Sequence, residues 1–174
     1  KFNNDMLPHG FSDPSCSKGV NKIRIDKGLR YEFATPKENL FIIYPDGFDK
    51  LSKNFKWIVL VHEMAHVSLD SLFLGINPGL NPGATAYETL KIKNEDILLK
   101  WNALTIKDEY TLITNYAGTN YHEDLAETAV AWVALRCMEK TSKKHRKKIL
   151  EGIPNRIKLL DSLKLNTEPM KCKF

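Results

Sequence analysis

Long hydrophobic runs and closely spaced cysteine pairs are both missing from this sequence of 174 residues. No apolar stretch approaches the about 20 residues that a membrane-spanning helix needs, so we expect no membrane span. The three cysteines, Cys16, Cys137 and Cys172, are too few for a disulfide-built scaffold and lack the paired spacing of a zinc ribbon or a redox motif. At most one disulfide can form, and the sequence does not determine which pair it joins.

Nucleic-acid-binding motifs, phosphate-binding glycine loops and internal repeats are absent too. The net charge of +5 comes from 26 Lys and Arg residues against 21 Asp and Glu residues. Five of the positive charges lie within residues 141–148, a segment without interleaved aromatic residues. We interpret this segment as a solvated helix face and expect no nucleic-acid partner.

The composition is that of an ordinary globular protein. Hydrophobic residues make up 43% and charged residues 27% of the chain, which excludes disordered, collagen-like and coiled-coil classes. No linker or change of composition divides the chain. We therefore expect a single domain over residues 1–174, with an irregular N-terminal arm over 1–18, and a monomer.

Local patterns predict a small sheet followed by helices. Short β patterns occur at residues 22–26, 31–35 and 39–44. Helical spacing of apolar residues occurs at 51–74, in parts of 95–115, and at 121–140, 142–151 and 154–165. Two Asn-Pro-Gly sequences within residues 76–86 predict a loop. The sum of these elements is an α+β domain.

His62, Glu63 and His66 form the pattern His-Glu-Met-Ala-His inside the first predicted helix. Residues four apart share one helical face, so both imidazoles can bind one metal ion, while Glu63 can reach a water bound to that metal. The spacing is typical of zinc hydrolases, whose three protein ligands leave a fourth position open for water. A chance match is the alternative, but it would leave two histidines in an apolar stripe, at about 1–3 kcal/mol for each unsatisfied group.

A third ligand is expected from the helix that begins near Asn120. Glu123 and Glu127 lie four residues apart at the head of an otherwise apolar stripe, so this face must meet charge. Glu123 can reach a metal held by another helix, and Glu127 can accept a hydrogen bond from a ligand imidazole. Glu123 can alternatively be read as a capping-box residue after Asn120. Asp70, one turn beyond His66, either orients that histidine or is a plain surface residue.

Tyr116 precedes this helix and carries a phenol that can donate a hydrogen bond to the oxyanion formed when a carbonyl is attacked. Tyr121 is the second candidate for this role, and either residue can instead be a core or rim aromatic. His122, beside Glu123 in the sequence, is a less favoured alternative ligand.

The segments HEMAH, at residues 62–66, and YAGTNYHEDLAE, at residues 116–127, together resemble the gluzincin metallopeptidases. The resemblance is strongest to the group that contains the anthrax lethal factor catalytic domain and the Pro-Pro endopeptidases. It covers the two motifs and little else. It implies a zinc ion with the ligands His62, His66 and Glu123. The further roles that it implies are those of general base for Glu63, transition-state stabiliser for Tyr116 and partner of a ligand for Glu127.

Three departures from the family pattern are visible. Leu125 stands where the family has an aromatic residue, Asp124 follows the ligand Glu, and the spacing between His66 and Glu123 is longer than usual. Fold and metal chemistry carry over from the resemblance more safely than substrate preference does.

The resemblance implies a zincin-like α+β domain, with a small N-terminal sheet packed on the HExxH helix and a helical C-terminal part. The expected function is a zinc-dependent metalloendopeptidase that hydrolyses peptide bonds by metal-bound water, with Glu63 as general base and a protein or peptide as substrate. A secreted or exported protein would suit the resemblance. The alternatives are a catalytically silent zincin-fold binding or interaction module, and metal-assisted hydrolysis of a substrate other than a peptide.

Overall fold

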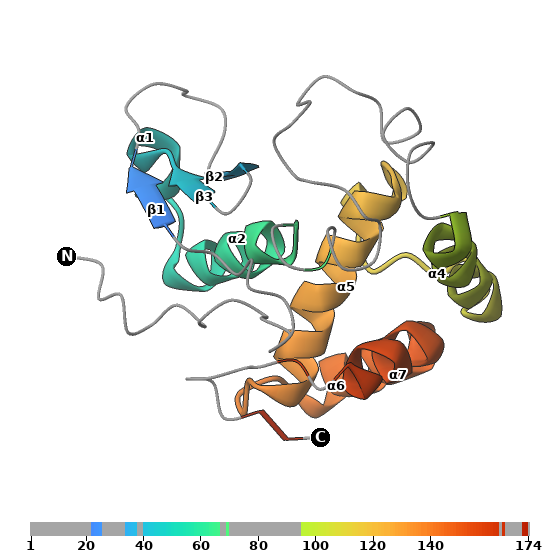
Figure 1. Ribbon diagram of the computed structural model, residues 1–174. Coiled ribbons are helices and arrows are strands. Elements are labelled where there is room, and N and C mark those ends of the chain that lie inside the picture. Colours follow the sequence, from blue (N-terminus) through green and yellow to red (C-terminus); the bar gives the residue numbers. More distant parts are fainter. Residues whose placement is uncertain are drawn as a thin grey trace.

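A computed structural model of the chain describes residues 22–25, 34–37, 40–66, 69, 95–163, 165 and 172–173 (Figure 1). Several sequence predictions fall outside these residues. They concern the arm over 1–18, the Asn-Pro-Gly loop over 76–86, and the residues Cys16 and Asp70.

Helices make up most of the described chain. They are α1 (Pro45–Phe48), α2 (Lys53–Ala65), α4 (Glu95–Lys107), α5 (Tyr121–Arg136), α6 (Lys143–Gly152) and α7 (Pro154–Ser162), together with a 3-10 turn, η3 (Tyr116–Gly118). Figure 1 shows α5 in the middle, with α2 on one side of it and α6 and α7 near its C-terminal half. None of the described helices is long and apolar enough to cross a membrane.

Three strands of four residues each form a small sheet. They are β1 (Lys22–Ile25), β2 (Ala34–Lys37) and β3 (Leu40–Ile43). The order is β1-β3-β2, with β3 parallel to β1 and antiparallel to β2. β2 is an edge strand, where Pro36 is tolerated because an edge position does not require its backbone N–H. β2 also contacts α2.

The predicted α+β fold class is wrong, and with it the zincin-like architecture. The described part of the chain is predominantly helical. Its main core is built from α2, α4, α5 and α7 and holds the two fully buried tryptophans, Trp101 and Trp132. The strands are peripheral to this core, since Ile43 belongs to a separate small cluster with Phe48, Val59 and Leu60. Strands of four residues are too short to build a principal layer, whereas the apolar periodicity of the helices runs over 9–16 residues.

α2 begins at a side-chain cap and packs one face against α5. The hydroxyl of Ser52 accepts a hydrogen bond from the backbone N–H of Phe55 at 3.3 Å, which satisfies one of the free N–H groups of the first turn. Val61, Met64 and Ala65 are buried in the main core, and each large buried side chain contributes about 1.5–3 kcal/mol by leaving water. This packing presents the last turn of α2 to the first turns of α5.

α5 is the central helix, and both of its ends are tied down. At its start, the side chain of Asn120 accepts hydrogen bonds from the backbone N–H groups of His122 and Glu123, at 2.9 and 3.1 Å. At its end, a disulfide joins Cys137 to Cys172, which is the pair that the sequence left open. The side chains of Ala126 and Ala129 are fully buried, and their small size allows neighbouring helices to approach closely.

Candidate metal centre

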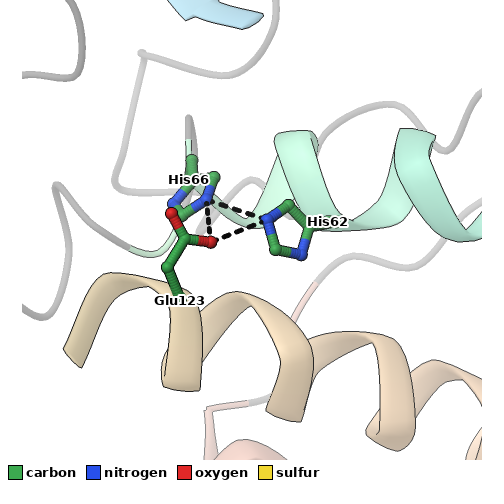
Figure 2. Close-up of side chains that lie close together, drawn as sticks. All are labelled: His62, His66 and Glu123. Carbon is green, nitrogen blue, oxygen red and sulfur yellow. Dashed lines mark hydrogen bonds and ion pairs between the residues drawn. The ribbon is translucent and has the colours of Figure 1, made fainter. Parts of the chain in front are cut away.

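Three side chains, from α2, from the residue that follows it and from α5, converge on one point (Figure 2). His62 Nε2 lies 3.1 Å from His66 Nε2, and Glu123 Oε2 lies 3.0 Å from the first and 3.4 Å from the second of these nitrogens. His62 and His66 are only 8% and 7% exposed. The three residues form a group that can hold a metal ion.

Local structure explains why these three residues meet. His62 lies in the last turn of α2 and His66 directly follows that helix, so the two imidazoles are one turn apart on the same side. The Asn120 cap fixes where α5 begins and thereby places Glu123 in its first turn. The packing of α2 on α5 then brings the Glu123 carboxylate next to both rings.

The donor atoms fit a small divalent cation. Ligand atoms about 2.0–2.2 Å from a tetrahedral zinc ion lie about 3.3–3.6 Å from one another, close to the separations observed here. Glu123 Oε2 is buried and has no hydrogen-bond partner, even though both imidazole nitrogens are within ion-pair distance. A cation bound between the three atoms would satisfy this carboxylate oxygen, and two His with one Glu is a known catalytic zinc set.

Glu127 contacts His62 on the side away from Glu123, and Thr114 contacts Glu127. The Nδ1–H of His62 donates to Glu127 Oε1 at 2.8 Å, so Nε2 is the nitrogen that faces the centre and that would bind a metal ion after losing its proton. Thr114 Oγ1 donates to the other carboxylate oxygen, Glu127 Oε2, at 2.7 Å. Burial would raise the pKa of Glu127, but the hydrogen bonds from His62 and Thr114 outweigh it and lower the pKa. Glu127 is therefore held as a carboxylate.

The charges of the centre shift its pKa values in opposite directions. Burial would lower the pKa of His62, but the carboxylates of Glu123 and Glu127 outweigh it and raise the pKa to about 9. Burial would raise the pKa of Glu123, but its contacts with His62 and His66 hold the pKa far below the usual range. Without a bound metal ion, His62 is therefore protonated and Glu123 is ionised at neutral pH, so a metal ion that binds His62 Nε2 must displace its proton.

Tyr116 lies at the rim of the centre. It is the first residue of η3, its ring centroid is 5.8 Å from that of His62, and it is 54% exposed. Burial of part of the side chain and the charges of Glu123 and Glu63 raise the pKa of the phenol to about 12, so it is protonated at neutral pH. Tyr121, the other candidate, is the first residue of α5 and is 36% exposed. Of the two tyrosines, Tyr116 is the one whose ring lies near that of His62.

The remaining predicted residues are placed as follows. Glu63 is half-buried on α2, and its charge contributes to the raised pKa values of both His62 and Tyr116. His122 gives its backbone N–H to Asn120 and is not a member of the metal-binding group. Asp70 lies outside the described residues.

Two residues that support the centre, Thr114 and Asp124, are not predicted from the sequence. Thr114 carries no motif signal, because its contact with Glu127 depends on how the segment before α5 folds back. Asp124 was noted only as a departure, yet its buried carboxylate accepts hydrogen bonds from Trp101 Nε1 at 2.7 Å and from Arg156 Nη1 at 2.5 Å. These bonds fix the first turn of α5, which carries Glu123. A charged residue on the core-facing side of a helix was the available signal for Asp124.

Comparison of the chain with protein-family models, with curated proteins and with solved structures gives no match. Membership of the gluzincin family stays a prediction that rests on the two motifs. What the structure adds is a group of His62, His66 and Glu123 that can bind a metal ion.

Proposed function

We propose that this protein is a zinc-dependent metalloendopeptidase that uses the two-His, one-Glu ligand set of the gluzincins. The observation that carries the proposal is the meeting of His62, His66 and Glu123, with a buried carboxylate oxygen that lacks a hydrogen-bond partner. Nitrogen and carboxylate donors in this ratio suit zinc, whereas magnesium and calcium prefer oxygen ligands throughout. Non-haem Fe(II) shares the two-His, one-carboxylate set, and metal analysis distinguishes the two ions.

Zinc held by these three residues would supply a Lewis acid that lowers the pKa of water and polarises a carbonyl group. Glu63 is the proposed general base, which takes a proton from the attacking water and passes it to the leaving amine. Its neighbour His62 and the rim residue Tyr116 both respond to its charge, which supports a place close to the reacting atoms.

Tyr116 is the proposed oxyanion donor. A phenol with a pKa of about 12 keeps its proton at neutral pH and can donate it in a hydrogen bond to the developing negative charge. Tyr116 is exposed at the rim of the centre, where a protein or peptide substrate would approach, and its hydroxyl also interacts with Glu123. Loss of one such donor typically reduces kcat by about 10²–10³-fold.

An oxidising compartment is part of the proposal. Disulfides persist mainly in secreted and exported proteins, and the bond between Cys137 and Cys172 supports such a location.

The first test is metal content after purification and dialysis, measured for the wild type, His66→Ala and Glu123→Gln. We expect one zinc per wild-type chain and little in either variant. His145→Ala and Glu151→Gln, exposed residues on α6, serve as matched controls and should keep the metal. A wild type that takes up no zinc would contradict the proposal.

The second test is digestion of a peptide library. Glu63→Gln should bind zinc normally and cleave no peptide, because it keeps the ligands but loses the base. If Glu63→Gln cleaves as fast as the wild type, the assignment of the general base is wrong. A wild type that binds zinc but cleaves nothing would favour the alternative of a binding module.

A further inference from the structure

The hydroxyl of Thr114 lies between the carboxylate of Glu127 and the turn that carries Tyr116. Thr114 Oγ1 donates to Glu127 Oε2 at 2.7 Å and accepts a hydrogen bond from the backbone N–H of Ala117 at 3.2 Å. The other oxygen of Glu127 accepts from His62 Nδ1 at 2.8 Å. One hydroxyl thus connects two parts of the centre that come from different segments.

The first bond acts on His62. A carboxylate held at one oxygen can rotate about its terminal torsion, which has only broad minima. Thr114 holds the second oxygen of Glu127 and removes this freedom. A fixed carboxylate fixes the plane of the His62 ring and keeps its proton on Nδ1, so that Nε2 stays directed to the other two donor atoms.

The second bond acts on the turn η3. Ala117, the middle residue of η3, is only 2% exposed, and Tyr116 directly precedes it. Because Thr114 Oγ1 holds the N–H of Ala117, the position of this turn is tied to the position of Glu127. Release of the turn would move the Tyr116 ring relative to His62, which lies 5.8 Å away between ring centroids.

The Thr114 side chain itself is exposed. Replacing it by Val therefore removes the hydroxyl without opening a cavity in the core, and the fold should be little affected. A loss of zinc affinity in such a variant would therefore report on the position of the ligands and not on the stability of the fold.

We infer that Thr114 is a positioning residue, whose single hydroxyl orients His62 through Glu127 and places Tyr116 through Ala117. The inference rests on the proposed function, because the group that is oriented is the proposed zinc centre. Outer hydrogen-bond partners of metal ligands typically change metal affinity by about 10–100-fold. We expect about 10-fold for Thr114, since Glu127 keeps its own bond to His62 when the hydroxyl is lost.

The test measures zinc affinity by competition with a chromophoric chelator, using Thr114→Val and Thr114→Ala as two variants without the hydroxyl. Both should bind zinc about 10-fold more weakly than the wild type, with melting temperatures of the metal-free proteins nearly unchanged. Thr114→Ser restores the hydroxyl and should restore the affinity. Thr119→Val, an exposed threonine at the end of the same turn, is the matched control and should bind as the wild type does.

A double-mutant cycle tests the route through Glu127. Thr114 acts on His62 only through that carboxylate, so Thr114→Val combined with Glu127→Gln should lose no more affinity than Glu127→Gln alone, within about 2-fold. Effects that multiply would overturn the route. In the peptidase assay, Thr114→Val should lower kcat more than it changes KM, because Tyr116 acts on the reacting carbonyl.

The outcomes separate the two proposals. A wild type that binds zinc, with Thr114→Val binding equally well, would overturn the positioning role and leave the zinc centre standing. The same holds if Thr114→Ser loses as much affinity as Thr114→Val. A wild type that binds no zinc would overturn the proposed function, and the positioning role with it.

Discussion

Replacing Arg156 by Met should destabilise the helical core, because Arg156 is the cation of a buried network. Its side chain is 0% exposed, with Nε 3.0 Å from Asp108 Oδ2 and Nη1 2.5 Å from Asp124 Oδ1. Asp108 directly follows α4, Asp124 lies in the first turn of α5 and Arg156 lies on α7, so the network joins three helices. Met keeps much of the apolar stem of Arg but leaves two buried carboxylates without their cation.

The magnitude follows from that burial. Removing one partner of a buried ion pair typically costs 3–5 kcal/mol, because the other charge stays in a place that water cannot reach. For a domain of this size each kcal/mol lowers the melting temperature by about 2–4 °C, so we expect a fall of about 6–20 °C. The first turn of α5 should also lose its anchor, and zinc affinity should fall with it.

The assay is urea unfolding of the wild type and Arg156→Met, with Arg136→Met as the matched control. Arg136 also donates two hydrogen bonds to carboxylate oxygens, both of Asp161, at 2.9 and 2.6 Å, but its side chain is 23% exposed. An ion pair that water reaches usually contributes about 1 kcal/mol or less, so the control should lose much less stability. Equal losses for the two variants would refute the reasoning from burial.

Three further outcomes are expected from contacts outside the metal centre. Burial would raise the pKa of Asp161, but the hydrogen bonds from Arg136 outweigh burial and lower this pKa. The stability that Asp161 contributes is therefore present above the ordinary Asp pKa of about 3.9, and it is lost as the pH falls through the lower pKa of the folded protein. Asp161→Asn should therefore flatten the loss of unfolding free energy on acidification, and an unchanged pH profile would contradict this. Cys172→Ser should cost about 3–4 kcal/mol in chemical unfolding, since the bond to Cys137 closes a loop of 35 residues, and a reducing agent should then have no further effect. Asn120→Ala should cost about 1 kcal/mol and weaken zinc binding, because two backbone N–H groups lose their acceptor; unaltered melting and zinc titration curves would show that the cap is dispensable.

Local geometry accounts for what could be predicted of the centre. The spacing between His62 and His66 places both side chains on one face of any α-helix, whatever that helix packs against. Asn120 marks the start of α5 by side-chain hydrogen bonds that span two and three residues, so the position of Glu123 in the first turn is also readable from the sequence. These relations need no knowledge of the fold.

The contacts that could not be predicted join residues far apart in the chain. Glu127 meets His62 across 65 residues, and Arg156 meets Asp108 across 48, so both depend on how the helices pack. The fold class failed for a related reason. A β pattern of five or six residues indicates a strand but not whether that strand belongs to the main core, and Ile43 shows that β3 instead faces a small separate cluster.

The difference between local spacing and long-range contacts explains why the candidate centre is stronger evidence for a metal site than the His-Glu-Met-Ala-His motif alone. Any helix can carry a His-Glu-Met-Ala-His segment, and without further ligands its two histidines can hydrogen-bond to backbone groups or to water. Here one histidine is oriented by a carboxylate from α5, and a second carboxylate from the same helix lies between both rings with an oxygen that has no hydrogen-bond partner. A protonated His62 offsets the charge of one of these two carboxylates, but the second remains a largely buried negative charge that costs desolvation energy. A bound cation removes that cost, which is why metal content is the decisive measurement on this protein.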